Sequence, residues 1–319
     1  MKYPAHIEVQ DPRFKRLVHP MSTLDCLADG FTWTEGPVWF GDHQCLIFSD
    51  IPSQRLLRWS ETEGLSTFRS ATGFNNGNTR DPQGRLIGCR HGFRDVVRTE
   101  HNGSLTILAD RYNGKAFNSP NDVIVQSDGT VWFTDPTYGM ISNFEGFRRP
   151  QEQPSQNVYR LTTDGDLSAV VTDMAQPNGL CLSPDEQTLY VAESGSSHNP
   201  EVPAIIRRFR LEQGQVFDDG VFAEIDRGLP DGIRTDVEGN LWSSAADGVH
   251  CFAPDGSRLG KVLVPQVVSN ICFGGPDGHR LYITATTAVY RVFVDVFGAE
   301  SWARPGGKPN RDPTSVDEE

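Results

Sequence analysis

Four oxygen-bearing side chains of this sequence stand in similar local contexts. Glu35 precedes Gly-Pro, Asn121 follows Pro, and Asn178 and Asp231 lie in Pro-Asn-Gly and Pro-Asp-Gly. Hard cations such as Ca²⁺ prefer carboxylate and amide oxygens, whereas Zn²⁺ more often recruits His or Cys. The set therefore indicates a divalent cation, Ca²⁺ first, with Mg²⁺, Mn²⁺ or Zn²⁺ as alternatives. The competing interpretation is that each motif is only a turn, because Pro, Asn and Gly favour turns.

The elements that must position these residues repeat six times, each time as a glycine-bearing turn followed by two short strands. The predicted first strands are Cys45–Asp50, Arg85–Cys89, Thr130–Asp135, Thr188–Glu193, Asn240–Ser244 and Arg280–Thr284. The predicted second strands are Arg55–Trp59, Asp95–Arg98, Asn157–Leu161, Ile205–Phe209, Gly248–Phe252 and Ala288–Val292. Successive repeats are 40, 45, 58, 52 and 40 residues apart. Propeller blades repeat at about 40 to 50 residues, so we predict an all-β, six-bladed β-propeller with four-stranded blades around a central channel.

Turn sequences and domain limits agree with this architecture. Tight turns with Gly in the last position are predicted at Asp81–Gly84, Ser127–Gly129, Thr163–Gly165, Pro254–Gly256 and Pro276–Gly278. No segment has a long 3.6-residue apolar period, so little helix is expected. We expect one domain over 1–319, with a core of about 25–300, an irregular segment 1–20 and a loose tail 304–319. The alternatives are a repeated β-sandwich or two smaller β domains, although no Pro/Ser-rich linker divides the chain.

Composition excludes several classes of function. The net charge is −13 and the isoelectric point about 5.1, which argues against a nucleic-acid partner because phosphate binding needs a basic face. No apolar run approaches the ~20 residues of a membrane helix, and no apolar signal sequence follows Met1. A cytoplasmic location is expected. The six cysteines form no CxxC motif, so reduced thiols are expected, with one disulfide as the open alternative.

A propeller brings the four oxygen-bearing residues together despite their separation in sequence. Each blade contributes one loop to each mouth of the channel. Glu35, Asn121, Asn178 and Asp231 all precede the predicted first strands of different repeats. We therefore expect the four side chains to converge near the channel axis.

Several motifs together resemble a known family. They are Glu35-Gly36-Pro37-Val38-Trp39, Asn76-Gly77-Asn78-Thr79-Arg80-Asp81, Asn118-Ser119-Pro120-Asn121-Asp122-Val123, Phe133-Thr134-Asp135-Pro136, Pro177-Asn178-Gly179 and Pro230-Asp231-Gly232. On these motifs the chain resembles the SMP-30/gluconolactonase/luciferin-regenerating family, and most closely its bacterial gluconolactonase branch, over roughly residues 25–300. The resemblance implies a six-bladed propeller with one catalytic divalent metal at the channel mouth.

The resemblance also implies roles for individual residues. Glu35, Asn121, Asn178 and Asp231 match the metal ligands, and Asn76, Asn78 and Arg80 match substrate-contacting positions. Cys89-Arg90-His91-Gly92 stands where relatives often carry Cys-Glu-His-Gly, which puts the substrate preference in question. His91 is expected either to hold a substrate hydroxyl or to be structural.

For lactone hydrolysis, a bound metal would polarise the carbonyl. Asp231 is expected to act as general base for water or, alternatively, as nucleophile. Asp122 is expected either to support the ligands from behind or to be an exposed carboxylate at a strand start. Two loops are candidate covers for the site: Ser194–Asn199, with a plain surface loop as alternative, and Phe144, Phe147 and Arg148, with packing on the rim as alternative.

Three functions remain open at this stage. The first is a metal-dependent sugar-lactone hydrolase acting on gluconolactone or a close aldonolactone. The second is an organophosphate hydrolase on the same metal cage, and the third is a non-catalytic propeller that binds calcium or protein partners. No Gly-x-Ser-x-Gly elbow, Walker A motif or dinucleotide fingerprint occurs. The small-molecule partner is expected to be a sugar lactone, and the protein a monomer or homodimer.

Overall fold

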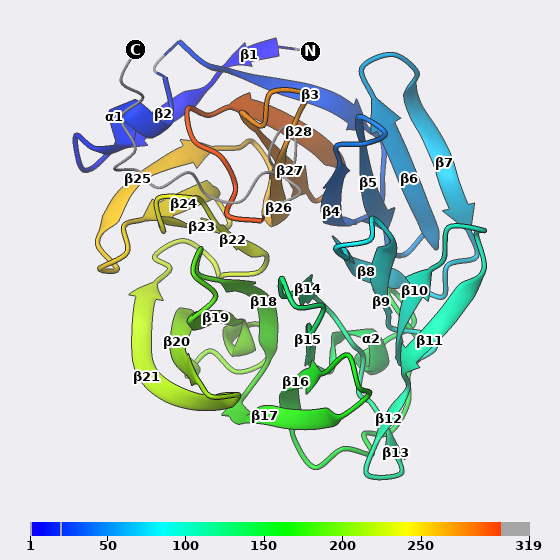
Figure 1. Cartoon of the computed structure of the whole chain (residues 1–319). Helices are drawn as coiled ribbons and strands as arrows, with labels where there is room; N and C mark the ends of the chain where they lie inside the picture. The colour runs from blue at the N-terminus through cyan, green and yellow to red at the C-terminus, as the bar shows by residue number, and fades with distance from the viewer. Residues whose placement is uncertain (1, 20, 301–319) are drawn as a thin grey trace, which may run out of the picture.

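Six twisted antiparallel sheets surround a central channel, as Figure 1 shows in a view along that channel. This computed structural model describes residues 2–19 and 21–300. We number the blades by the order of their innermost strands. Four blades have four strands each, in the order β4-β5-β6-β7, β8-β9-β10-β11, β14-β15-β16-β17 and β18-β19-β20-β21. Blades five and six have a fifth strand each, in the orders β22-β23-β24-β25-β2 and β26-β27-β28-β3-β1. The predicted all-β, six-bladed propeller is confirmed.

The strand bounds of the first three blades are β4 (Thr34–Phe40), β5 (Cys45–Asp50), β6 (Arg55–Ser60), β7 (Gly64–Ser70), β8 (Asn75–Arg80), β9 (Leu86–Arg90), β10 (Asp95–Thr99), β11 (Leu105–Ala109), β14 (Val123–Val125), β15 (Val131–Asp135), β16 (Gln156–Leu161) and β17 (Leu167–Met174). Those of the last three are β18 (Pro177–Leu182), β19 (Thr188–Glu193), β20 (Ile205–Glu212), β21 (Gln215–Glu224), β22 (Ile233–Thr235), β23 (Leu241–Ser244), β24 (Gly248–Phe252), β25 (Arg258–Leu263), β26 (Val268–Gly274), β27 (Arg280–Ala285) and β28 (Ala288–Phe293). A separate hairpin joins β12 (Arg111–Tyr112) to β13 (Lys115–Ala116). The strands predicted as first in each repeat are second from the axis, because an inner strand precedes each one.

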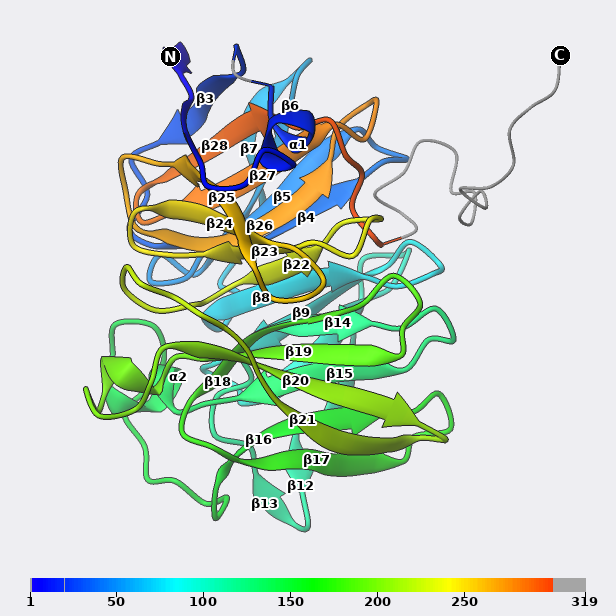
Figure 2. The same cartoon turned by 90° about the vertical axis from the view of Figure 1, so that its left-hand side faces the viewer.

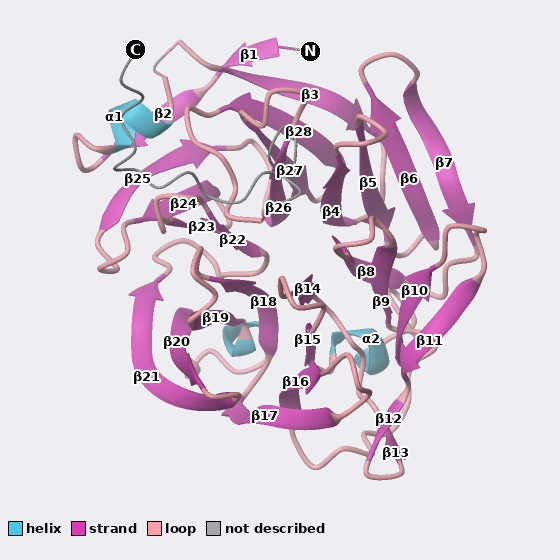
Figure 3. Cartoon of the chain, viewed as in Figure 1, coloured by secondary structure: helices cyan, strands magenta, loops and turns pink. Residues whose placement is uncertain are grey.

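Helix is scarce, as Figure 3 makes clear. The described residues contain α1 (Phe14–Leu17), α2 (Tyr138–Ile141) and the 3-10 turn η1 (Gly195–Ser197). Figure 2 turns the ring on edge and shows α2 at one of its faces. None of the helices in the described residues is long and apolar enough to cross a membrane. The five predicted turns are confirmed by the positive φ of their glycines, which range from 76° to 94°.

The N-terminal segment differs from the prediction of an irregular segment 1–20. It contains β1 (Lys2–Pro4), β2 (His6–Val9) and α1. Strand β1 pairs with β3 (Thr23–Asp29), and β2 pairs with the outer strand β25. The segment was predicted to be irregular because its sequence is polar, but strands at the edge of a sheet need little apolar pattern. Phe14 of α1 is buried and its ring centroid lies 5.9 Å from that of Trp242. The predicted loose tail 304–319 lies outside the described residues.

The ring closes by joining the two ends of the chain in one sheet. In blade six, β28 pairs with β3, with Val292 opposite Leu24 and Arg291 opposite Asp25. The apolar core lies between neighbouring sheets rather than in the channel. Between blades six and one, for example, Trp39 stacks on Tyr282 with ring centroids 5.2 Å apart. All six cysteines fall in the described residues, and five of them are free thiols, as expected for reduced cysteines: Cys45, Cys89, Cys181, Cys251 and Cys272.

Candidate active site

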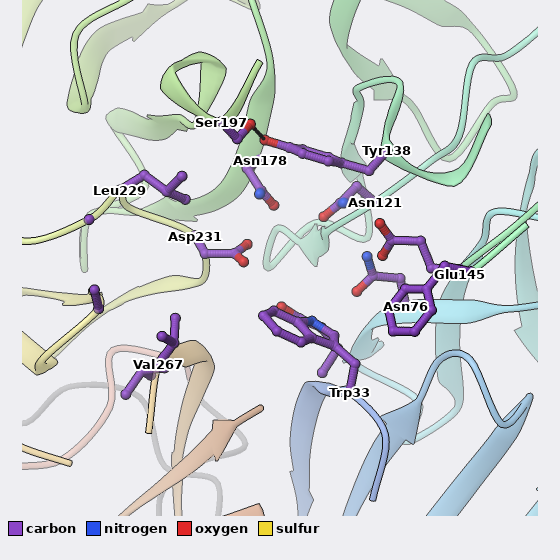
Figure 4. A pocket seen from close by; sticks show the side chains of 15 residues that line it. Trp33, Asn76, Asn121, Tyr138, Glu145, Asn178, Ser197, Leu229, Asp231 and Val267 are labelled. Carbon is purple, nitrogen blue, oxygen red and sulfur yellow. Dashed lines mark hydrogen bonds between the residues drawn. The ribbon is translucent and has the colours of Figure 1, made fainter. Parts of the chain in front are cut away.

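One end of the channel holds a cavity of about 370 Å³. All four predicted ligands line it: Glu35, Asn121, Asn178 and Asp231. In the close view of Figure 4, the side chains of Asn121, Asn178 and Asp231 point into the same space. The structure therefore brings together side chains that are up to 196 positions apart (231 − 35) in the sequence.

Each of the four comes from the start of an innermost strand, in blades one, three, four and five. Glu35 and Asn178 are the second residues of β4 and β18, and Asn121 and Asp231 stand two residues before β14 and β22. In these positions the motifs are more than turns. A Cβ added to Gly179 would lie 2.0 Å from the Asp231 carbonyl oxygen, and one added to Gly232 would lie 2.0 Å from Asn270. Gly179 therefore lets two inner strands come into backbone contact, and Gly232 leaves room for the Asn270 side chain.

The donor set fits a hard divalent cation. Glu35 Oε2 accepts hydrogen bonds from the Gly36 N–H at 2.6 Å and from Asn270 Nδ2 at 3.0 Å. Asn178 Oδ1 is buried without a hydrogen-bond partner, so it is a free acceptor at the cavity wall. Two carboxylates and two amides are the oxygen ligands that Ca²⁺ takes. Within the described residues no three His, Cys, Asp or Glu side chains gather at metal-binding range, so a cation here would depend on the asparagines.

The electrostatics point the same way. Burial, reinforced by the charge of Asp122, raises the pKa of Glu35 to about 8. Burial and then the charge of Glu35 raise the pKa of Asp231 well above its usual range. Ionised carboxylates in such a place need a positive charge near them. A bound cation would provide it, and would hold both groups ionised at neutral pH.

Asn76 lines the cavity, but His91 lies behind it. His91 Nδ1 is 2.9 Å from the Glu145 carbonyl oxygen, so this nitrogen carries the proton. Nε2 then accepts from Asn76 Nδ2 at 3.1 Å. Asn76 Oδ1 is left buried without a partner. His91 thus orients Asn76 and the loop of Glu145, and does not itself reach the cavity.

Asn78 and Arg80 do not line the cavity. Asn78 Nδ2 donates to the Gly36 carbonyl at 2.9 Å, and Arg80 forms an ion pair with Asp42. A strand advances ~3.3 Å per residue, so Arg80 lies on the order of 13 Å along β8 from Asn76. The matched motif places the three residues on one strand, but only its first residue is at the cavity end.

Asp122 is neither exposed nor at the cavity wall. It is 1% exposed, its Oδ2 lies 3.3 Å from Arg234 Nη1, and its Oδ1 accepts from the Val123 N–H at 3.0 Å. No hydrogen bond within the described residues joins it to the side chain of Asn121 or Asn178. Asp122 therefore forms a buried ion pair with Arg234 behind the cavity wall.

Two loops cover the cavity. Phe144 and Glu145 from the loop after α2 line it, as does Ser197 of η1. Tyr138 Oη and Ser197 Oγ lie 2.8 Å apart and join the loops of blades three and four. Phe147 packs edge-on against Phe74 instead, with ring centroids 5.1 Å apart, and Arg148 does not line the cavity. Both loops named from the sequence therefore border the site.

Glu145 is the main residue that sequence reasoning missed. Its carboxylate lines the cavity and has no hydrogen-bond donor among the described residues. Burial raises its pKa to about 7. The only signal in the sequence was its position between Phe144 and Phe147.

The buried His91 should make the protein less stable in acid. Burial lowers its pKa to about 4, below the ordinary value near 6.5, so between these pH values the unfolded chain binds a proton that the folded chain does not. Folding stability from this residue is therefore full above about pH 6.5 and falls as the pH drops toward 4. Urea unfolding should give a lower free energy of unfolding at pH 5 than at pH 7.5. This loss should be about 1 to 2 kcal/mol smaller in His91→Gln than in the wild type. An equal loss in both proteins would contradict a buried neutral imidazole.

Related proteins support the resemblance noted from the motifs. The chain matches the family described as SMP-30/Gluconolactonase/LRE-like region over residues 33–287. It is 34% identical over 315 residues to a gluconolactonase of Zymomonas mobilis, covering 90% of this chain and 85% of that protein. It is 30% identical to the pentonolactonase XacC of Haloferax volcanii, covering 78% of this chain and 80% of that one.

Solved structures agree with these sequence matches. The gluconolactonase XC5397 of Xanthomonas campestris superimposes with a TM-score of 0.85 at 37% identity, over 92% of this chain and 95% of that chain. A calcium-binding regucalcin of Agrobacterium tumefaciens shares the fold with a TM-score of 0.68 at 18% identity, over 86% and 94%. The chain therefore belongs to the SMP-30/gluconolactonase/LRE-like family.

Proposed function

We propose that this protein hydrolyses a sugar lactone with the help of one divalent cation, Ca²⁺ by preference. The observation that carries the proposal is the convergence of Glu35, Asn121, Asn178 and Asp231 from four blades into one cavity. Membership of the family and the gluconolactonase and pentonolactonase relatives support the lactone as substrate. The cytoplasmic location and the choice between monomer and homodimer stay predictions.

In this proposal the cation would be held by four cage residues, namely Glu35, Asn121, Asn178 and Asp231. The cation would polarise the lactone carbonyl as a Lewis acid. Asp231 would take the proton of the attacking water, because it is a half-buried carboxylate that lines the cavity. Direct attack by Asp231 is the second route. Asn76 Oδ1 and the Glu145 carboxylate are acceptors for the hydroxyl groups of the sugar ring. The apolar side chains of Trp33, Phe144 and Leu229 line the rest of the cavity and limit the access of water.

The apolar part of the cavity wall keeps phosphotriester hydrolysis as a second candidate. Glu145 and Asn76 argue against it, because a phosphotriester offers them no donor. A propeller that only binds protein partners is disfavoured because it has no need of mutually repelling carboxylates at a channel mouth. A propeller that only binds Ca²⁺ would use the same residues, and the lactone assay below separates it from an enzyme.

Metal removal tests the proposal directly. Purified protein treated with a chelator should lose its hydrolysis of glucono-δ-lactone and recover it on addition of Ca²⁺, Mg²⁺, Mn²⁺ or Zn²⁺. The recovery ranks the ions. Faster hydrolysis of a phosphotriester than of the lactone would favour the second candidate, and no hydrolysis of either with metal present would favour a binding role.

Asp231→Asn should keep the fold and reduce kcat for the lactone by about 10²- to 10⁴-fold, since a general base contributes this much. Asp164→Asn, in an exposed turn, is the control and should match the wild type. Circular dichroism and kcat at saturating metal are the measurements. Undiminished turnover in Asp231→Asn would remove this residue from the chemistry.

Glu145→Gln should weaken the recognition of hydroxyl groups while keeping the backbone carbonyl that holds His91. A hydrogen bond to a charged acceptor contributes about 1.5 to 3 kcal/mol, so kcat/KM for glucono-δ-lactone should fall roughly 10- to 100-fold. δ-Valerolactone, which has no hydroxyl groups, should be hydrolysed at the wild-type rate. Because burial raises the pKa of Glu145 to about 7, the effect should be larger at pH 8 than at pH 6. Equal losses for both lactones would contradict this role.

A further inference from the structure

The last residue of the second strand differs between the blades that supply cage residues and those that do not. In blades one, three, four and five, β5, β15, β19 and β23 end in residues with oxygen acceptors: Asp50, Asp135, Glu193 and Ser244. In blades two and six, β9 and β27 end in Arg90 and Ala285. The acceptors therefore occur only in the blades whose innermost strand has a cage residue at or just before its start.

In three of these blades the acceptor bonds the backbone N–H that lies three residues before the cage residue. Asp50 Oδ1 accepts from the N–H of Thr32 at 3.0 Å, three residues before Glu35. Asp135 Oδ2 accepts from the N–H of Asn118 at 2.8 Å, three residues before Asn121.

Blade four has the same spacing, whereas in blade five the acceptor bonds the cage residue itself. Glu193 Oε2 accepts from the N–H of Ala175 at 2.7 Å, three residues before Asn178, and its Oε1 accepts from Gln176 at 2.8 Å. In blade five, Ser244 Oγ accepts directly from the N–H of Asp231 at 2.9 Å.

These carboxylates are buried, so their only effective partners are in the protein. Asp50 and Asp135 are 0% exposed and Glu193 is 5% exposed. Hydrogen bonds from backbone N–H groups to an ionised acid are short and strong. Burial raises the pKa of Asp135 to about 8, so at neutral pH its hydrogen bond is that of a protonated acid. Two of these carboxylates make a further polar contact. Arg55 Nη2 lies 2.9 Å from Asp50 Oδ2, and the Gly195 N–H donates to Glu193 Oε1 at 2.8 Å.

We propose that Asp50, Asp135 and Glu193, with Ser244, are positioning residues that fix the entry of each inner strand so that the cage oxygen points at the cation. The inference rests on the proposed metal cage. Residues that orient ligands from behind typically change metal affinity by 10- to 100-fold, and this is the size of effect expected of the strand-end acids.

Asparagine and glutamine variants separate these acids by their contacts. Both oxygens of Glu193 accept backbone N–H groups, so Glu193→Gln must turn its NH₂ against one of them. Asp50→Asn must turn its NH₂ against either Arg55 or the backbone. In Asp135 only Oδ2 accepts, while Oδ1 and Asn118 Oδ1 are both buried without a partner. Asp135→Asn therefore keeps the acceptor and should be tolerated.

Blade two offers a matched control. Asp95 is 3% exposed and accepts from Arg90 Nε at 2.7 Å, so it resembles Asp50 in burial and in its arginine partner. Blade two supplies no cage residue. Asp95→Asn should lower the melting temperature without changing metal affinity.

The test is isothermal titration of the metal-free, full-length proteins with Ca²⁺ alone, alongside calorimetric melting. Glu193→Gln and Asp50→Asn should bind Ca²⁺ 10- to 100-fold more weakly than the wild type, and Asp135→Asn and Asp95→Asn within about 3-fold of it. If Glu193→Gln does not fold, Asp50→Asn and the milder Ser244→Ala carry the test, the latter with a loss of about 5-fold.

Two results would overturn the inference while leaving the cage intact: wild-type affinity in Glu193→Gln and Asp50→Asn, or an equal loss in Asp95→Asn. Failure of the wild type to bind Ca²⁺, Mg²⁺ or Mn²⁺ would instead refute the cage itself, and the inference with it.

Discussion

The site depends on how closely the innermost strands of successive blades approach one another around the axis. A Cβ on Gly36 would meet the Asn76 carbonyl oxygen at 2.3 Å, and one on Gly77 would meet that of Asn121 at 2.4 Å. The Gly77 N–H donates to the same Asn121 oxygen at 2.8 Å. Backbone contact of this kind leaves no room for side chains between the strands. The residues just before these glycines are therefore the ones whose side chains can meet in the channel.

The charges of the channel are arranged unequally. Glu35, Asp231 and Glu145 all line one cavity, and burial raises the pKa of each. The buried cation below them, Arg234, is paired with Asp122 at 3.3 Å and lies 3.5 Å from Glu300. The charge of Arg234 is therefore neutralised by Asp122 and Glu300. Within the described residues, the three cavity acids are left without a positively charged partner. A site so built favours a cation or protons, and a polyhydroxylated ligand over an anionic one.

The sequence predicted the blade count and the four cavity residues because both depend on local pattern. Turn glycines mark the repeats, and motifs such as Pro177-Asn178-Gly179 mark the start of an inner strand. It could not place His91 and Arg80, because their positions depend on which end of a strand faces the cavity. Glu145 was missed because its loop is held by tertiary contacts. A Cβ on Gly146 would lie 1.8 Å from the Gly139 carbonyl oxygen, a constraint that no local pattern records.

Blade six supplies no cage residue, yet the cage depends on it. Ser269 Oγ donates to the Thr34 carbonyl at 2.6 Å, and Asn270 Nδ2 donates to Glu35 at 3.0 Å. Blade six is also the sheet in which β3 and β28 join the two ends of the ring. Loosening that closure would therefore move Glu35 relative to Asp231, which comes from the neighbouring blade on the other side. Because the proposed ligands come from four different blades, their relative positions depend on how the ring is closed, and the strand that closes the ring acts on the site without touching it.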